Sequence, residues 1–184
     1  MRESFAVSVL MLLAAGCAYT IYAPGERLVY TLPADEGWQV AYLQPLQHPM
    51  VDPSGKIEMF LRGGENITAW TELVILQTTF RMLRLGGIDT AQDVYQKDMA
   101  LREANCPGST RWQVIEETPG RVLYEWWTKP CQGFPELHEV ALIADGIRDR
   151  FQLAYRATAP AMDSATRERW LGVLRAAKVE ANLK

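Results

Sequence analysis

The sequence has few of the residues from which metal centres and nucleophilic sites are built. Its 184 residues include two histidines and three cysteines, and no two of the cysteines form a CxxC pair. The sequence therefore predicts no zinc cluster, no other metal site and no cofactor. Acidic residues outnumber Lys and Arg by 22 to 19, which gives a formal net charge of −3. A nucleic-acid-binding protein would carry a basic excess, so that class is disfavoured.

The sequence also lacks an apolar run long enough to cross a bilayer as a helix. The longest run, FAVSVLMLLAAG over residues 5–16, is too short for a span. It fits the apolar region of a secretory signal, with Arg2 supplying the positive charge before it. The N-terminus therefore predicts export from the cytoplasm.

The run ends in LLAAGC, residues 12–17. This segment resembles the lipobox of bacterial lipoproteins, in which small residues precede a cysteine that is acylated and becomes the mature N-terminus. The resemblance implies a signal peptide over residues 1–16, lipidation of Cys17, with palmitate among the attached acyl chains, and a tether over residues 17–26. Ala14 stands where such a signal usually has Leu. Ordinary cleavage near Gly16 or Ala18, or an uncleaved anchor, therefore remains open.

Lipidation would place the protein on a membrane. Several acyl chains hold a protein stably, whereas one chain gives marginal binding. The residue after the cysteine is Ala18 rather than Asp. In the Gram-negative lipoproteins that the segment resembles, this implies sorting to the outer membrane, with the domain facing the periplasm.

The rest of the chain has the composition of an ordinary globular domain, with 48% apolar and 22% charged residues. Residues 57–79 read as strand, Gly-rich turn and strand, because apolar and polar side chains alternate. Residues 90–104 predict a helix capped by Thr90. Its expected apolar stripe contains Val94, Tyr95, Met99 and Leu101. Asp163 begins a second helix that runs to about Lys178, with a buried stripe of Trp170, Leu171, Leu174 and Ala177.

Two further hairpins are predicted between the helices. Pro119-Gly120 suits a turn between strands over residues 110–117 and 122–128. Asp145-Gly146 is the strongest hairpin signal, and a two-residue turn there would pair Val140 with Phe151. One face of that hairpin would bury its apolar side chains: Val140, Leu142, Phe151 and Leu153. The other face would leave its polar side chains accessible: Arg148, Arg150 and Gln152.

This order of elements predicts an α+β fold over residues 27–184. Short connections make most strands antiparallel. We therefore expect one mostly antiparallel sheet of about six to eight strands, with two main helices packed on it as an α/β/α sandwich.

Three segments carry a resemblance to a known family: GGENITAWTELVILQ, Cys-Pro-Gly at residues 106–108, and RERWLGVLRAAKV near the C-terminus. With these segments the chain resembles uncharacterised bacterial envelope lipoproteins that have a PsbP-like fold, named for the photosystem II extrinsic protein. The resemblance implies an extracytoplasmic assembly or binding module, and no catalytic residues carry over from it.

Cys106 and Cys131 flank the hairpin that turns at Pro119-Gly120. In the register of a two-residue turn they fall almost opposite each other at the open end. An oxidising compartment favours a disulfide between them. The alternative is two free thiols, one of them buried.

Two pairs of residues are possible ligand or partner contacts. Trp126 and Trp127 would point to opposite faces of their strand, either as a platform for a sugar or lipid or as core residues on both faces. Arg148 and Arg150 would form cross-strand charge pairs with Glu139 on a solvated face or, as a weaker alternative, an anion site.

No catalytic constellation is recognisable. His48 lies in a Pro-rich loop near Asp52 and Ser54, but the composition Asp-Pro-Ser-Gly is that of a turn. His138 is expected to be a satisfied core residue. We therefore expect a non-enzymatic, membrane-anchored lipoprotein that serves as an assembly or protein-interaction module, with an envelope protein as partner. The alternative is an extracytoplasmic binding module for a small apolar or glycan ligand.

Overall fold

The structure is a computed structural model that describes residues 25–45, 55–81, 89–131, 135–158 and 162–181. In chain order the elements are β1 (Glu26–Val29), η1 (Ala34–Glu36), β2 (Trp38–Pro45), β3 (Gly55–Arg62), β4 (Glu72–Phe80), α1 (Ala91–Asn105), β5 (Thr110–Thr118), β6 (Arg121–Thr128), β7 (Leu137–Asp145), β8 (Asp149–Ala157), α2 (Ser164–Ala176) and β9 (Lys178–Ala181).

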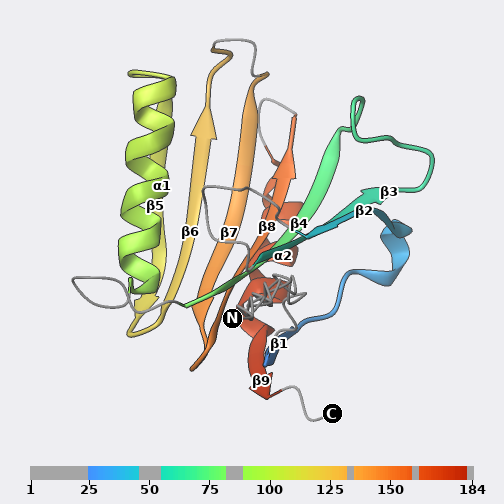
Figure 1. Ribbon diagram of the computed structural model, residues 1–184. Coiled ribbons are helices and arrows are strands. Elements are labelled where there is room, and N and C mark those ends of the chain that lie inside the picture. Colours follow the sequence, from blue (N-terminus) through green and yellow to red (C-terminus); the bar gives the residue numbers. More distant parts are fainter. Residues whose placement is uncertain (1–24, 46–54, 82–88, 132–134, 159–161, 182–184) are drawn as a thin grey trace, which may run out of the picture.

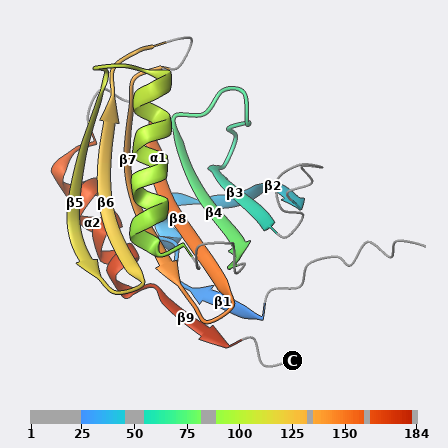
Figure 2. The same cartoon turned by 60° about the vertical axis from the view of Figure 1, so that its left-hand side comes forward.

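The main sheet has seven strands in the order β2-β3-β4-β8-β7-β6-β5, and every neighbouring pair is antiparallel. Helices α1 and α2 lie on opposite sides of this sheet (Figure 1; Figure 2). The expected α+β sandwich with a mostly antiparallel sheet is confirmed. The pair β3–β4, predicted from alternation over residues 57–79, lies beside the central strand β8.

Each helix begins where the sequence predicts. The Thr90 side chain accepts a hydrogen bond from the backbone N–H of Asp93, and the Asp93 carboxylate accepts one from the N–H of Thr90. Asp163 caps α2 by accepting from the N–H of Thr166 at 2.7 Å. The predicted stripe of α2 is fully buried, but Leu101 of α1 is 62% exposed. Leu101 was therefore wrongly assigned to the buried stripe.

Two cores lie on the two faces of the sheet because side chains alternate along each strand. The core under α2 contains apolar side chains from the helix and four strands: Val74, Leu76, Leu123, Val140, Leu142, Phe151, Leu153, Trp170, Leu171 and Leu174. The core under α1 is more aromatic: Tyr95, Val122, Tyr124, Trp126, Leu137, Ala141, Ile143 and Ala154. The predicted core face of the β7–β8 hairpin is confirmed.

The β7–β8 turn differs from the prediction. Val140 pairs with Tyr155 and Asp145 with Arg150, so the connection over residues 146–148 is longer than the expected two-residue turn. The shift of four positions is even, so each side chain keeps its predicted face. Glu26 explains the longer loop, since its carboxylate accepts hydrogen bonds from the backbone N–H groups of Ile147, Arg148 and Asp149 at 2.9–3.0 Å.

A small second sheet was missed by the sequence analysis. Strand β1 pairs with β9 in antiparallel register, and β9 follows directly on α2. The predicted second helix therefore ends at Ala176 rather than near Lys178. Glu26, expected to end the tether, is the first residue of β1. A Cβ at Gly146 would clash with the Glu26 carboxylate, so any larger residue there would displace this contact.

Candidate functional site

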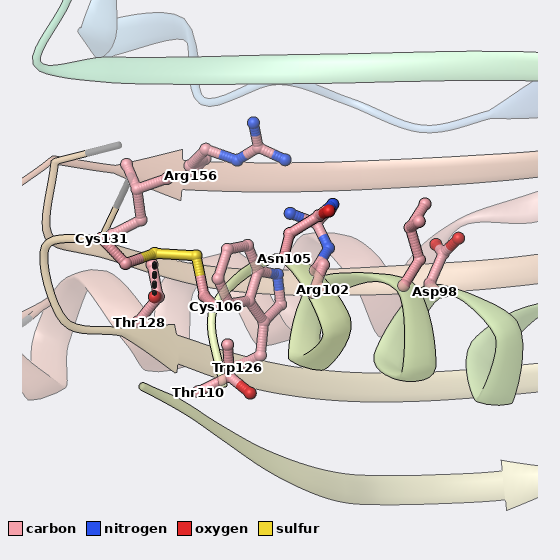
Figure 3. A pocket seen from close by; sticks show the side chains of 11 residues that line it. Asp98, Arg102, Asn105, Cys106, Thr110, Trp126, Thr128, Cys131 and Arg156 are labelled. Atoms are coloured by element: carbon pink, nitrogen blue, oxygen red, sulfur yellow. Dashed lines mark hydrogen bonds between the residues drawn. A yellow bond between two sulfur atoms is a disulfide. The ribbon is translucent and has the colours of Figure 1, made fainter. Parts of the chain in front are cut away.

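A cavity of about 220 Å³ lies between the C-terminal half of α1 and the sheet, and we call it the Trp126 cavity. Figure 3 shows its side chains around the indole of Trp126 and the disulfide. Most of its lining comes from α1, β6 and the flanking ends of β7 and β8: Asp98, Leu101, Arg102, Asn105, Cys106, Thr110, Trp126, Thr128, Cys131, Leu137 and Arg156.

The disulfide closes one end of this cavity (Figure 3). Cys106 is the C-cap residue of α1, and its bond to Cys131 agrees with the predicted pairing, with the two Cα atoms 5.8 Å apart. The hairpin between them is regular near its turn and carries a bulge between Val114 and Glu116. The bond therefore fixes the end of α1 to the strand end that follows β6.

Trp126 forms the floor of the cavity and is only 2% exposed. Its ring stacks on Trp112 with centroids 5.4 Å apart, and the Arg102 guanidinium carbon lies 4.2 Å from its ring centroid. Trp127 points to the opposite face, as predicted, and stacks on His138 at 4.9 Å. Because neighbouring side chains already contact the Trp126 ring, it is not a free stacking platform for a sugar.

Two arginines border the cavity in different electrostatic situations. Arg156 pairs with Glu139 at 2.5 Å, and that carboxylate is fully buried. Burial alone would raise the pKa of Glu139, but Arg156 and Arg102 outweigh this effect and hold the pKa below its ordinary value. In the part of the chain that the structure describes, no carboxylate oxygen lies within 4.0 Å of the Arg102 guanidinium.

Asp98 brings a carboxylate to the same wall, one helical turn before Arg102. It accepts a hydrogen bond from the Gln152 amide at 3.1 Å, and this amide also donates to the hydroxyl of Tyr124 at 2.8 Å. Burial raises the pKa of Asp98 above its ordinary value. Asp98 is therefore a second acidic group, besides Glu139, that lies near the two arginines at the cavity.

The prediction that Arg148 and Arg150 pair with Glu139 on a solvated face is wrong except for the exposure of Arg148, since Glu139 is buried and pairs with Arg156. Arg148 is exposed, but Arg150 is 9% exposed, and it donates to the Asp145 carboxylate at 2.5 Å and to the backbone oxygen of Asp89. Asp145 also accepts from the backbone N–H of Ala91, the first residue of α1. Since the helix covers this face, Arg150 is a structural residue and the two arginines do not form one site.

The other face contains a buried polar group centred on His138. Its Nδ1 accepts from the backbone N–H of Met162 at 2.9 Å, so Nε2 carries the proton toward Glu125, 2.7 Å away. Arg167 donates to both oxygens of Glu125. Burial lowers the pKa of His138, and the hydrogen bond to Glu125 opposes this only in part. The prediction of a satisfied core histidine is confirmed.

Cys17, the predicted lipidation site, lies outside the described residues. So do His48, Asp52 and Ser54 of the Pro-rich loop, for which no site was predicted. Within the described ranges, no group of three or more His, Cys, Asp or Glu side chains is arranged to hold a metal ion. Among the same residues, no helix is both long and apolar enough to cross a membrane.

The sequence matches no protein-family model and no curated protein. Among solved structures, the solution structure of the cyanobacterial PsbP (CyanoP) from Synechocystis sp. PCC 6803 aligns with a TM-score of 0.45 and 14% identity, over 92% of this chain and 99% of that chain. This similarity is too low to transfer a function from that protein to this chain.

Proposed function

We propose that this chain is a lipid-anchored, non-enzymatic interaction module of the cell envelope, and that it holds a partner protein through the Trp126 cavity. The observation that carries the proposal is the cavity itself. Ligand sites for drug-sized molecules measure about 300–1,000 Å³. A cavity of about 220 Å³ suits one large side chain instead.

The surroundings of the cavity have the chemistry of a protein interface. Leu101 is 62% exposed and lines the cavity beside Arg102 and Trp126. Interface hot spots are enriched in Trp, Tyr and Arg, and they cluster around pockets that a partner side chain fills. An exposed Leu next to such a pocket adds apolar area that a docked partner would cover.

The buried histidine supports a non-enzymatic role. A catalytic base must reach a proton on its substrate. Both ring nitrogens of His138 are instead occupied inside the protein, by Met162 and Glu125, and the side chain is 3% exposed. This group stabilises the packing of α2 on the sheet.

The proposed anchor is an acylated Cys17 in the outer membrane, with the domain in the periplasm. A chain from Cys17 to Gly25 spans at most about 28 Å when fully extended. The folded domain would therefore stay close to the membrane surface, where an envelope partner could meet it.

The alternative occupant is a small apolar molecule, which the apolar floor of the cavity favours.

Site-specific photo-crosslinking in membranes distinguishes a partner protein from a small molecule in the cavity. A photoreactive amino acid at Leu101, in the full lipidated chain, should give an adduct with the mass of a second protein. The same probe at Val40, which is 56% exposed but does not line the cavity, is the control. An adduct from Val40 but not from Leu101 would contradict the proposal.

A further inference from the structure

Of the two arginines that line the Trp126 cavity, Arg156 is in direct contact with a carboxylate among the described residues, and Arg102 is not. Arg156 and the buried Glu139 neutralise each other at 2.5 Å. Within the described part of the chain, Arg102 makes no ion pair, and one face of its guanidinium rests on the Trp126 ring at 4.2 Å. A guanidinium donates hydrogen bonds in its own plane, so stacking leaves its N–H groups free to donate.

The group that Arg102 can receive is an anion with planar acceptor geometry. Arginine binds carboxylates through parallel N–H donors. Asn105 lies three residues further along α1 and also lines the cavity, so its amide can add a donor on the same helix face. Figure 3 shows both side chains beside the indole.

The neighbouring space is apolar. Trp126 and Leu137 are 2% and 5% exposed, and they line the cavity together with the Cys106–Cys131 disulfide. A ligand that uses the whole site must therefore present a carboxylate and an apolar group of side-chain size close together. In a polypeptide, a C-terminal residue carries both on one Cα atom.

We propose that the Trp126 cavity binds the C-terminus of a partner chain, with the last apolar side chain in the cavity and the terminal carboxylate on Arg102. Capture of a terminal carboxylate is a recurring mode of peptide recognition. This proposal rests on the proposed function, because it names the partner segment that the interaction module would hold.

Asp98 sets the strength of this contact. Its carboxylate lines the same wall, one turn from Arg102, so it repels a bound carboxylate whenever it is ionised. Removing this charge should therefore strengthen binding, whereas removing the charge of Arg102 should weaken it. These opposite signs distinguish a carboxylate site from a purely apolar one.

The test uses fluorescently labelled hexapeptides that end in Leu, Phe or Val, each as the free acid and as the C-terminal amide. The protein is the full chain in lipid nanodiscs, because free detergent could itself occupy an apolar cavity. Fluorescence anisotropy should show that at least one acid binds about tenfold more tightly than its amide. Arg102→Gln should abolish that preference, and Asp98→Asn should increase it.

Lys97→Gln is the matched control, since it removes one positive charge from the same helix at a residue that does not line the cavity. It should leave the preference unchanged. Equal binding of acid and amide would overturn the proposal. It would also be overturned if hexanoate displaced the labelled acid with the same efficiency as the unlabelled peptide. If the peptide test fails but a protein adduct still forms at position 101, only the proposal of C-terminus binding is overturned. If no protein adduct forms there either, the proposed interaction module is overturned as well.

Discussion

The Nε of Arg150 lies 2.5 Å from Oδ1 of Asp145, and both side chains are buried where α1 begins. Asp145 also lies 3.5 Å from the Arg81 guanidinium. This charged group joins the β7–β8 loop to the start of the helix that forms the outer wall of the Trp126 cavity.

Arg150→Ala should therefore destabilise the fold by about 3 kcal/mol, because it leaves a buried carboxylate with weaker compensation. Arg148→Ala, at an exposed position of the same loop, should cost less than about 0.5 kcal/mol. Urea denaturation of both variants measures the difference. Equal costs would show that the Asp145–Arg150 pair does not stabilise the fold.

The Glu26 carboxylate should hold the β7–β8 loop in place. Burial would raise the pKa of Glu26, but the N–H groups of Asp149, Ile147 and Arg148 lower it overall. Glu26→Ala should cost about 2 kcal/mol, since it removes a charged acceptor from several backbone donors. Hydrogen exchange at residues 147–149 should become faster. Glu180→Ala, which removes only an exposed pair with Arg27, should leave that exchange unchanged.

His138 should make stability depend on pH. Its pKa is lowered in the folded state, so the unfolded chain binds a proton that the folded chain does not. Stability should therefore fall as the pH drops below the ordinary pKa of 6.5, by at most about 1.4 kcal/mol per pH unit from this residue.

Urea denaturation at about pH 7.5 and about pH 5.5 measures this dependence, since a histidine charge changes in that window. In His138→Gln the difference between the two conditions should be smaller than in the unmodified chain. If the stability difference between the two pH values were the same in both proteins, the pKa of His138 would be equal in the folded and unfolded states.

The disulfide should stabilise the fold by about 3.5 kcal/mol in the chain-entropy model, given the 25-residue separation of its cysteines. The double variant Cys106→Ala, Cys131→Ala should lose this contribution and expose the end of α1 to faster hydrogen exchange. Mass spectrometry of an unreduced digest should show the linked peptides. Free thiols at both positions in protein from the periplasm would refute the bond.

Acylation of Cys17 remains a prediction from the apolar segment and LLAAGC. Cells fed a clickable fatty acid should label the unmodified chain and not the Cys17→Ser variant. Equal labelling of the two would rule out this cysteine as the lipidation site. Fractionation of the labelled chain would then show whether it reaches the outer membrane.

The sequence predicted the features that depend on local pattern. Alternation identified the strands, and Thr90 and Asp163 marked both helix starts because caps act within one turn. Even the wrong β7–β8 turn kept Val140 and Phe151 on the core face, since the register shifted by an even number of positions. The Pro119-Gly120 hairpin indicated the disulfide partners because it brings the segments before β5 and after β6 together at its open end.

Long-range contacts were not predictable in this way. Glu26 contacts a loop more than 120 residues away in the sequence. The residues around Asp145-Gly146 therefore do not indicate that the turn is longer than two residues. Arg150 was assigned to solvent because the sequence does not show that the start of α1 covers its face. The cavity forms where the end of α1 packs near Trp126. In the sequence, only the pairing of Cys106 with Cys131 indicated that these two segments lie close together.

Filling the Trp126 cavity tests the central claim most directly. Asn105 is an exposed residue on the last turn of α1 that lines the cavity, so Asn105→Trp should fill the opening without disturbing the core. Crosslinking from Leu101 in membranes is then compared between the unmodified and the filled chain. We predict that the protein adduct is lost in the filled chain while its urea midpoint stays the same. An undiminished adduct in a correctly folded Asn105→Trp chain would contradict the proposal that the partner docks in this cavity.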